Sequence, residues 1–173
     1  KSKIKSKMKI QLNPEQDKDK ILSSVNDILE KNALLSLATV TQNQEPQICS
    51  VYYAYDDEFN LYYWSEKETQ HSKNIIKNNK VAVNILDTSQ NWGSKLKGLK
   101  IYGIAKETSL NELAIGAQKY MRRFLKVKNL ISNIQDFNKK YNSKLYKIEI
   151  KKIILLDETK FGKEEYKELS ISR

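Results

Sequence analysis

The chain has 173 residues, a net charge of +10 and 39% hydrophobic residues, which predicts one globular domain and excludes an intrinsically disordered protein. No apolar run approaches the roughly 20 residues that cross a bilayer, and no secretory signal is visible, so we expect no membrane segment. The one Cys cannot form an intramolecular disulfide, which favours the reducing cytoplasm. One His and one Cys fall short of the usual zinc ligand sets, so we expect no metal site.

The positive charge begins in "KSKIKSKMK", where Lys occupies every odd position of residues 1–9. We interpret residues 1–12 as a flexible basic tail of a single domain that covers residues 1–173. A high positive charge can also indicate a nucleic-acid partner. The remaining Lys residues are scattered and no recognition motif accompanies them, so nucleic acid ranks last among the partners.

The first predicted element is a helix in "NPEQDKDKILSSVNDILEKN", residues 13–32. Asn13 is a suitable N-cap, and Pro14 suits the first helical position because its missing N–H would be unpaired there. Apolar residues recur at helical spacing and form one stripe: Ile21, Leu22, Val25, Ile28 and Leu29.

Three strands are predicted next, over residues 33–41, 47–56 and 61–65. The second, "QICSVYYAYD", is rich in the β-branched and aromatic residues that strands favour. Short turn sequences, "NQE" and "DDEFN", separate the three segments. Because the connections are short, we expect the strands to pair as an antiparallel meander.

A short helix is predicted after Thr69, ending near residue 79, and strands are predicted over residues 81–86 and 99–108. Thr69 is a good N-cap for this helix. Gly103 lies within the last of these strands and indicates a bend or a bulge.

The clearest helix covers residues 109–125, because Ser109 and Glu112 have the spacing of a capping box. A further helix over residues 127–139 and a long strand over residues 144–158 are predicted after it. The whole pattern indicates a mainly β fold of six antiparallel strands with helices. A barrel or a sandwich fits this pattern, and a closed barrel has the advantage that it removes exposed strand edges.

The only His of the chain lies in "SEKETQHSKNI", residues 65–75. The first N–H groups of a helix have no intrahelical partners and carry partial positive charge, so a helix that starts at Thr69 could bind an anion. Gln70 and His71 would add side-chain donors, and a nearby dianion would favour the charged imidazole. The alternative is an ordinary N-cap beside a surface His, and this short pattern does not decide between the two.

Many weak local matches in a fixed order carry a family resemblance. They are "LLSLATVTQNQEPQICSVYYAYDDEFNLYYWSEKETQHSKNIIKNNKVAVNI", "LKGLKIYGIAKE" and, later, "AQKYMRRFLKVKNLIS" and "LYKIEIKKIILLDETKFG". The chain resembles the pyridoxamine 5'-phosphate oxidase-like family of FMN-binding split barrels, and in particular a small uncharacterised bacterial branch of it. The resemblance implies a six-stranded antiparallel split β-barrel flanked by helices, which forms a homodimer with two FMN molecules at the subunit interface.

The resemblance also implies which residues hold the flavin. The strand "ICSVYY" would offer backbone groups to the isoalloxazine ring, and the segment after the next strand would contact the ribityl chain and the phosphate. The implied residues are Cys49, Ser50, Val51, Trp64, Ser65, Thr69, Gln70 and His71. The oxidase proper has Arg then Lys where this chain has Gln70 then His71. Its C-terminal substrate-binding Trp and Arg are not recognisable here, so pyridoxamine phosphate is not expected as the substrate.

Four further residues are open candidates. Trp92, in a polar loop, could stack on a flavin ring from the partner subunit or pack on its own barrel. Lys97 could reach an anion or remain a solvated Lys. Arg122 and Arg123 could bind phosphate across the dimer or lie on the surface.

The favoured function is that of an FMN-dependent oxidoreductase, in which the cofactor carries the chemistry and the protein binds and tunes it. No residue is an evident general acid or base, so the catalytic residues are unknown. The alternative is a flavin- or ligand-binding module without turnover, and a basic nucleic-acid binder ranks third. The substrate and the electron donor do not follow from the residues.

Overall fold

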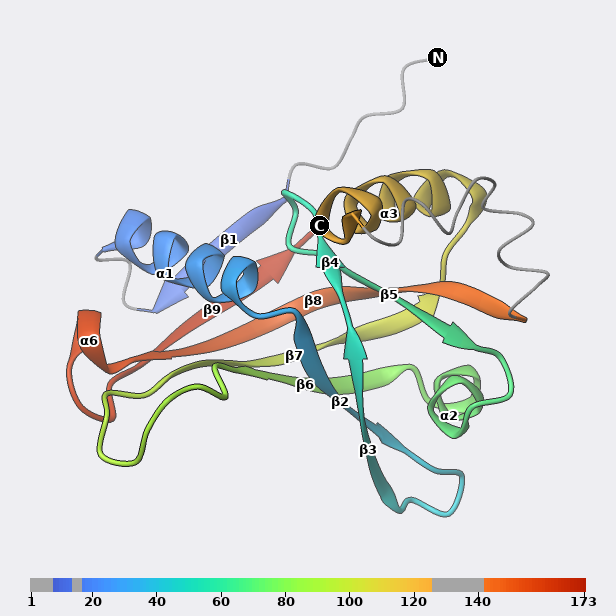
Figure 1. The fold of residues 1–173 in the computed structure, drawn as a ribbon, viewed down its shortest axis with the longest axis horizontal. Coiled ribbons are helices and arrows are strands. Elements are labelled where there is room, and N and C mark those ends of the chain that lie inside the picture. Colours follow the sequence, from blue (N-terminus) through green and yellow to red (C-terminus); the bar gives the residue numbers. More distant parts are fainter. Residues whose placement is uncertain (1–7, 14–16, 126–141) are drawn as a thin grey trace.

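The computed structural model describes residues 8–13, 17–125 and 142–173, and the statements below concern these residues (Figure 1). Their strands form one sheet in which every pairing is antiparallel. The helix predicted over residues 127–139 lies outside the described residues.

Seven of the strands form a closed ring. They are β2 (Leu34–Val40), β3 (Pro46–Tyr52), β4 (Ala54–Tyr55), β5 (Leu61–Glu66), β6 (Lys80–Leu86), β7 (Lys97–Glu107) and β8 (Ser143–Asp157). Around the ring, β2 pairs with β3, β4 continues β3 and pairs with β5, and β8, β7 and β6 lead back to β2. The predicted fold class, an antiparallel barrel with helices, is confirmed. If β3 and β4 are taken as one interrupted strand, the ring has the six members that were predicted.

The sheet extends beyond the ring because β8 has two neighbours on one of its sides. Its first part pairs with β5, and its last part pairs with β9 (Tyr166–Ser172), which in turn pairs with β1 (Lys9–Asn13). The described part of the sheet therefore has nine strands and not six. A short helix, α6 (Glu158–Phe161), connects β8 to β9, and neither α6 nor β9 was predicted.

The N-terminal segment differs from its prediction in two ways. Residues expected to belong to a flexible tail form β1, in which Ile10 and Leu12 pack against the core. Asn13 ends this strand and does not cap a helix. Helix α1 (Lys18–Lys31) begins after Asp17, which has a left-handed backbone (φ 70°) and makes no side-chain cap bond. The alternation of Lys and Gln with Ile and Leu is the strand signal, and the neighbouring run of Lys obscured it.

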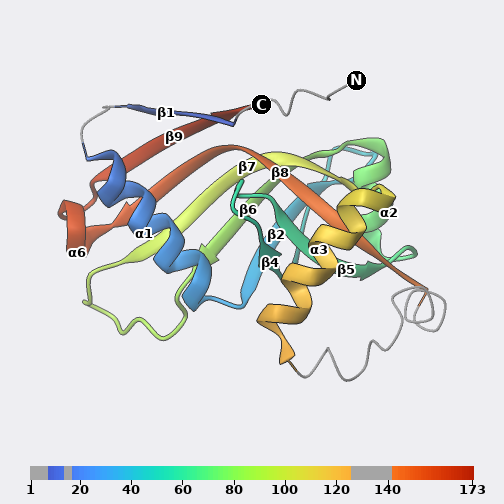
Figure 2. The same ribbon diagram turned by 90° about the horizontal axis from the view of Figure 1, so that it is seen from above.

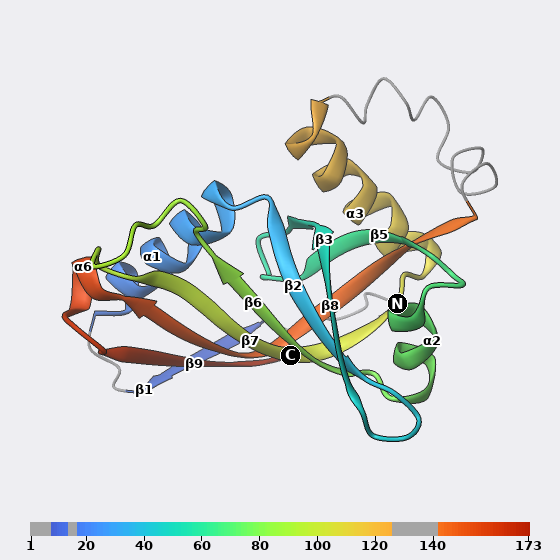
Figure 3. The same cartoon turned by 60° about the horizontal axis from the view of Figure 1, so that its bottom comes forward.

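Two helices lie at opposite ends of the barrel (Figures 1 and 3). Helix α1 covers one end with the predicted apolar stripe, of which Ile21, Val25, Ile28 and Leu29 are buried. Helix α2 (Gln70–Lys77) lies at the other end and buries Ile75. The barrel interior is filled by aliphatic side chains and by Tyr53 and Tyr63, both with no exposed surface.

Helix α3 (Leu110–Arg123) packs against β4, β5 and β8, and the predicted capping box of Ser109 and Glu112 is present at its start (Figure 2). Gly116 allows the close packing of this helix. A Cβ atom there would lie 2.4 Å from the ring of Tyr62 and 2.7 Å from the side chain of Leu145.

Candidate functional site

The start of α2 forms a polar junction with the end of β5. Strand β5 ends at Glu66, and the Thr69 N–H donates to the Glu66 carbonyl in the turn that follows. Thr69 is the N-cap, as predicted, and its hydroxyl accepts the Ser72 N–H at 3.4 Å. A tight turn thus carries the chain from the last residues of β5 directly into the first turn of the helix.

This turn collects three hydroxyls and one imidazole, which we call the donor cluster: Ser65, Thr69, His71 and Ser72. The Ser65 Oγ lies 2.6 Å from His71 Nε2, and the Thr69 Oγ1 lies 3.2 Å from the same nitrogen. The Thr69 hydroxyl also donates to Ser72 Oγ at 2.8 Å. The structure therefore brings together Ser65, Thr69 and His71, three of the residues that the sequence nominated, and adds Ser72, which it did not.

The donor cluster leaves hydrogen-bonding capacity unused. The backbone N–H groups of Gln70 and His71 have no acceptor among the described residues, as expected for the first turn of a helix. The imidazole of His71 is half-buried, and burial lowers its pKa below the ordinary value of 6.5. His71 is therefore a neutral donor or acceptor at neutral pH, with its ring 6.4 Å from the ring of Tyr63.

Gln70 belongs to a second network and not to the donor cluster. Its Nε2 donates to Asn74 Oδ1 at 2.8 Å, and Asn74 Nδ2 lies 3.0 Å from both Thr39 Oγ1 and Gln47 Oε1. This network ties α2 to β2 and to β3. Asn74 is buried and was missed in the sequence, where its only signal is the four-residue spacing from Gln70.

Strand β3 lies beside this junction and has one free edge. It pairs with β2 alone, and no strand of the described chain pairs with its other edge. Cys49 and Val51 are half-buried and pack toward the core, whereas Ser50 is exposed. Burial raises the pKa of the Cys49 thiol, so this Cys is protonated at neutral pH. The free edge offers backbone N–H and C=O groups to a ligand.

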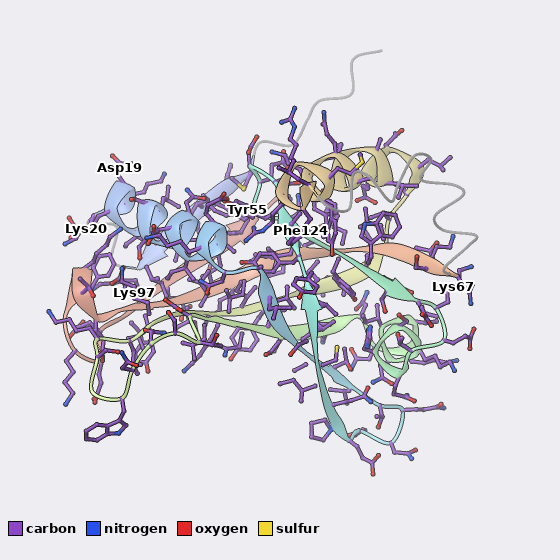
Figure 4. All side chains as sticks on the ribbon, viewed as in Figure 1. Asp19, Lys20, Tyr55, Lys67, Lys97 and Phe124 are labelled. Atoms are coloured by element: carbon purple, nitrogen blue, oxygen red, sulfur yellow. The ribbon has the colours of Figure 1, made fainter. Side chains whose placement is uncertain are left out.

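Three other nominated residues lie elsewhere. Trp64 is half-buried on β5, next to Ser65. Trp92 is fully exposed in the loop before β7. The Nζ of Lys97, at the first residue of β7, lies 3.6 Å from the buried carboxylate of Asp157. Lys97 is far from α2, since Ala105, near the other end of β7, is the residue bonded to the loop after α2. Figure 4 shows Lys97 and Lys67 on opposite sides of the molecule. Within one chain, Trp92 and Lys97 are not brought to the donor cluster.

Arg123 has a partner that the sequence did not indicate. Its Nη2 donates to three carbonyls at the end of α1, those of Leu29 (2.7 Å), Glu30 (3.1 Å) and Asn32. Its guanidinium also lies 4.6 Å from the ring centre of Tyr53. Arg122 is exposed. Arg123 therefore stabilises the packing of α3 on α1.

Within residues 8–13, 17–125 and 142–173, no three His, Cys, Asp or Glu side chains gather as they would around a metal ion. Among the same residues, no helix has the length and hydropathy needed to cross a bilayer.

Comparisons with known proteins give one family and one fold. A sequence model of the family described as pyridoxamine 5'-phosphate oxidase matches residues 21–157. A search of curated proteins gives no significant match. A protein of unknown function from Agrobacterium tumefaciens has a similar structure, with a TM-score of 0.66 and 16% identity over 81% of this chain and 57% of that one. The chain thus spans little more than half of that relative.

Two other similar structures carry functional names. One is the heme storage protein HutZ from Vibrio cholerae, with a TM-score of 0.61 and 14% identity over 74% of this chain and 88% of that one. The other is an F420 reductase, with a TM-score of 0.54 and 18% identity over 74% of this chain and 94% of that one. Identities this low demonstrate a shared fold and no more.

Proposed function

Because this chain belongs to the pyridoxamine 5'-phosphate oxidase family, we propose that it is a flavoprotein that binds FMN and acts as an oxidoreductase on a small molecule. The single observation that carries the proposal is the donor cluster at the start of α2, beside the free edge of β3. The similarity to an F420 reductase is compatible with redox chemistry on this fold, and the similarity to a heme storage protein keeps heme as the competing ligand.

The donor set fits the terminal phosphate of FMN. The hydroxyls of Ser65 and Thr69, the His71 ring and the free N–H groups of residues 70 and 71 converge on one helix start, where the helix dipole favours an anion. No Lys or Arg donates to the cluster within the described residues. The phosphate would thus be held by hydroxyls, by the His71 ring and by the helix start, and the Arg and Lys clamp of the oxidase proper is not reproduced.

The isoalloxazine ring is assigned to the free edge of β3. Backbone groups of Cys49, Ser50 and Val51 would meet the polar edge of the ring, with Trp64 at the neighbouring strand end. Gln70 would act indirectly, since its bond to Asn74 fixes α2 against β3. When bound, FMN supplies the hydride or electron transfer. The chain's own residues bind and orient the cofactor, and no general acid or base is assigned.

A second copy of the chain is proposed to complete the site. The outer face of β2, β3, β6 and β7 has exposed apolar side chains, among them Ile48 (70% exposed) and Tyr102 (46%), which line a hollow of about 350 Å³. Exposed apolar surface of this kind marks protein interfaces. Proteins of this family are typically dimeric, and a homodimer through this face would place a flavin at the interface. Trp92 and Lys97 would then act from the partner subunit.

Comparing FMN with riboflavin tests the phosphate assignment. We expect His71→Ala to weaken FMN binding by about 10- to 100-fold, which corresponds to roughly 1.5–3 kcal/mol for a hydrogen bond to a charged group. Riboflavin, which lacks the phosphate, should bind both proteins equally. Flavin fluorescence quenching measures both affinities. Equal loss for both flavins would place His71 at the ring and not at the phosphate.

The visible spectrum and anaerobic reduction test the rest of the proposal. Purified protein should show flavin absorption, or acquire it with added FMN, and NADH or NADPH should bleach it. Bound flavin that neither donor reduces would favour the alternative of a ligand-binding module without turnover. A Soret band, or failure to take up FMN, would overturn the flavin proposal.

A further inference from the structure

We propose that the chain has a second ligand site, a pocket under α2 that takes a small amphipathic anion, such as an aromatic or aliphatic carboxylate or sulfonate. The pocket has a volume of about 380 Å³, within the usual range for small-molecule sites. Six of its lining residues carry the argument: Lys67, Ile75, Ile76, Ala105, Lys106 and Tyr146. None of them belongs to the donor cluster, although the Tyr146 hydroxyl shares a hydrogen bond with Ser72 of that cluster: burial raises the Tyr146 pKa, and this bond opposes the rise.

The last part of β7 lines one side of the pocket through Ala105, Lys106 and Glu107. Gly103 and Ala105 both face the interior, where Leu99 and Ile101 fill the same face of the strand nearer its start. The walls are apolar, with Ile75 from the helix and the ring of Tyr146 from β8. An apolar group on a ligand would be removed from water there.

One cation at this pocket lacks an ionic partner. Lys106 lies 3.1 Å from the carboxylate of Glu112, and Glu107, also at the pocket, lies 2.8 Å from Lys144. Lys67 makes no ion pair in the part of the chain that the structure describes, and Figure 4 shows it at the α2 side of the molecule. The rim therefore has an excess positive charge above an apolar floor. Ile76, which is 75% exposed, adds an apolar side chain at the solvent side of the pocket.

Tyr146 separates this pocket from the donor cluster. Its ring stacks on that of Tyr63 with an interplanar angle of 15° and a centroid distance of 5.4 Å. Tyr63 in turn lies next to His71. A ligand in the pocket would contact the C-terminal half of α2, whereas the phosphate is assigned to its first turn. The two ligands would bind to the same helix without overlapping.

Two fluorescent probes of nearly the same shape test the site: 8-anilinonaphthalene-1-sulfonate and its uncharged analogue N-phenyl-1-naphthylamine. We expect the sulfonate to bind with one site per chain. Lys67→Met should weaken its binding about threefold to fivefold, the range for a partly exposed ion pair, and should leave the uncharged probe unaffected. Ala105→Leu fills the pocket and should abolish the binding of both probes.

Controls separate this site from the other surfaces. Ile48→Ser lies on the outer sheet face and should leave probe binding unchanged. FMN affinity should be unchanged in Ala105→Leu, so that failure of the flavin proposal and failure of this one are distinguishable. If circular dichroism shows that Ala105→Leu is unfolded, Ala105→Val and Lys67→Met carry the test. Wild-type probe binding by folded Ala105→Leu, or loss of binding in Ile48→Ser, would overturn the proposal.

Discussion

The end of α1 and the start of α2 contrast in how their unpaired backbone groups are satisfied. The last carbonyls of α1 accept three hydrogen bonds from the single guanidinium of Arg123. The first N–H groups of α2 have no acceptor among the described residues, although hydroxyls and an imidazole surround them. A helix end whose backbone groups are hydrogen-bonded by a side chain of the same protein stabilises the fold. A helix end that remains open beside converging donors is where a ligand is expected.

The start of α3 extends this contrast, because it has the same kind of N-cap as α2 but a carboxylate of the chain itself is bonded there. Ser109 donates its N–H to the Glu112 carboxylate at 2.9 Å, which closes the helix end with a capping box. Burial alone would raise the pKa of Glu112, but hydrogen bonds from Ser109, Lys147 and Lys106 outweigh it and lower the pKa to about 2. Both α2 and α3 begin with a hydroxyl N-cap that accepts the N–H of the third residue after it, and the two starts differ because only α3 has a carboxylate of its own, that of Glu112, in its first turn.

The largest expected effect concerns the closed end of α1. Arg123→Ala should lower the free energy of unfolding by about 3 kcal/mol, because three carbonyls lose a charged donor and Tyr53 loses a stacked cation. Arg122→Ala, at the exposed neighbour on the same helix, should change it by less than about 0.5 kcal/mol. Urea unfolding followed by circular dichroism measures both. Equal effects for the two variants would remove Arg123 from its assigned role.

A smaller effect is expected when the two N-caps are compared. Thr69→Ala and Ser109→Ala should each cost about 1 kcal/mol of stability, the usual value for a lost N-cap. Only Thr69→Ala should also weaken FMN binding, because only its hydroxyl belongs to the donor cluster. Thermal unfolding and flavin titration of both variants provide the measurements. If FMN affinity falls in Ser109→Ala as well, the contrast between open and closed helix starts is lost.

The smallest expected effect is the pH dependence of the open end. Burial lowers the pKa of His71 in the free chain, whereas a bound phosphate dianion would favour the charged ring and raise it. Binding then takes up a proton, so FMN affinity should be higher at low pH and fall as pH rises through the pKa of the bound form.

His71→Gln separates the imidazole from the phosphate, whose own second ionisation lies near ~6. The ratio of wild-type to variant affinity should decrease a few-fold between pH 5.5 and 8.5, measured by fluorescence titration. A ratio that does not change with pH would mean that His71 stays neutral when FMN is bound.

Local patterns predicted most of the fold, and long-range pairing accounts for what they missed. The alternation in β2, the aromatic content of β3 and the capping box at Ser109 are signals within a few residues, and they were correct. Strands β1 and β9 pair with each other from the two ends of the chain. Neither strand is flanked by a local sequence pattern that indicates its distant partner. The predicted cap at Asn13 failed for the same reason, since strand pairing extends to that residue.

The residue types of the candidate site could be predicted from the sequence, whereas the hydrogen-bond and ion-pair partners of those residues could not. The predicted helix start indicated that Thr69 and His71 would be near one another, and the family resemblance added Ser65. Sequence could not show that Gln70 turns toward Asn74, because both orientations of its side chain suit a first helical turn. Nor could it show that Lys97 faces the buried Asp157, which lies sixty residues later in the chain.

The position of β8 in the ring has a consequence for the order of folding. This strand pairs with β5 on one side and β7 on the other, so Leu61 and Tyr63 have no partner there until residues near Ile148 and Tyr146 exist. During synthesis the earlier strands form an open sheet with two unprotected edges, and closure must wait for the C-terminal part of the chain. Contacts between segments so distant in sequence slow folding. Strand β1, whose partner is the last strand made, is expected to dock last of all.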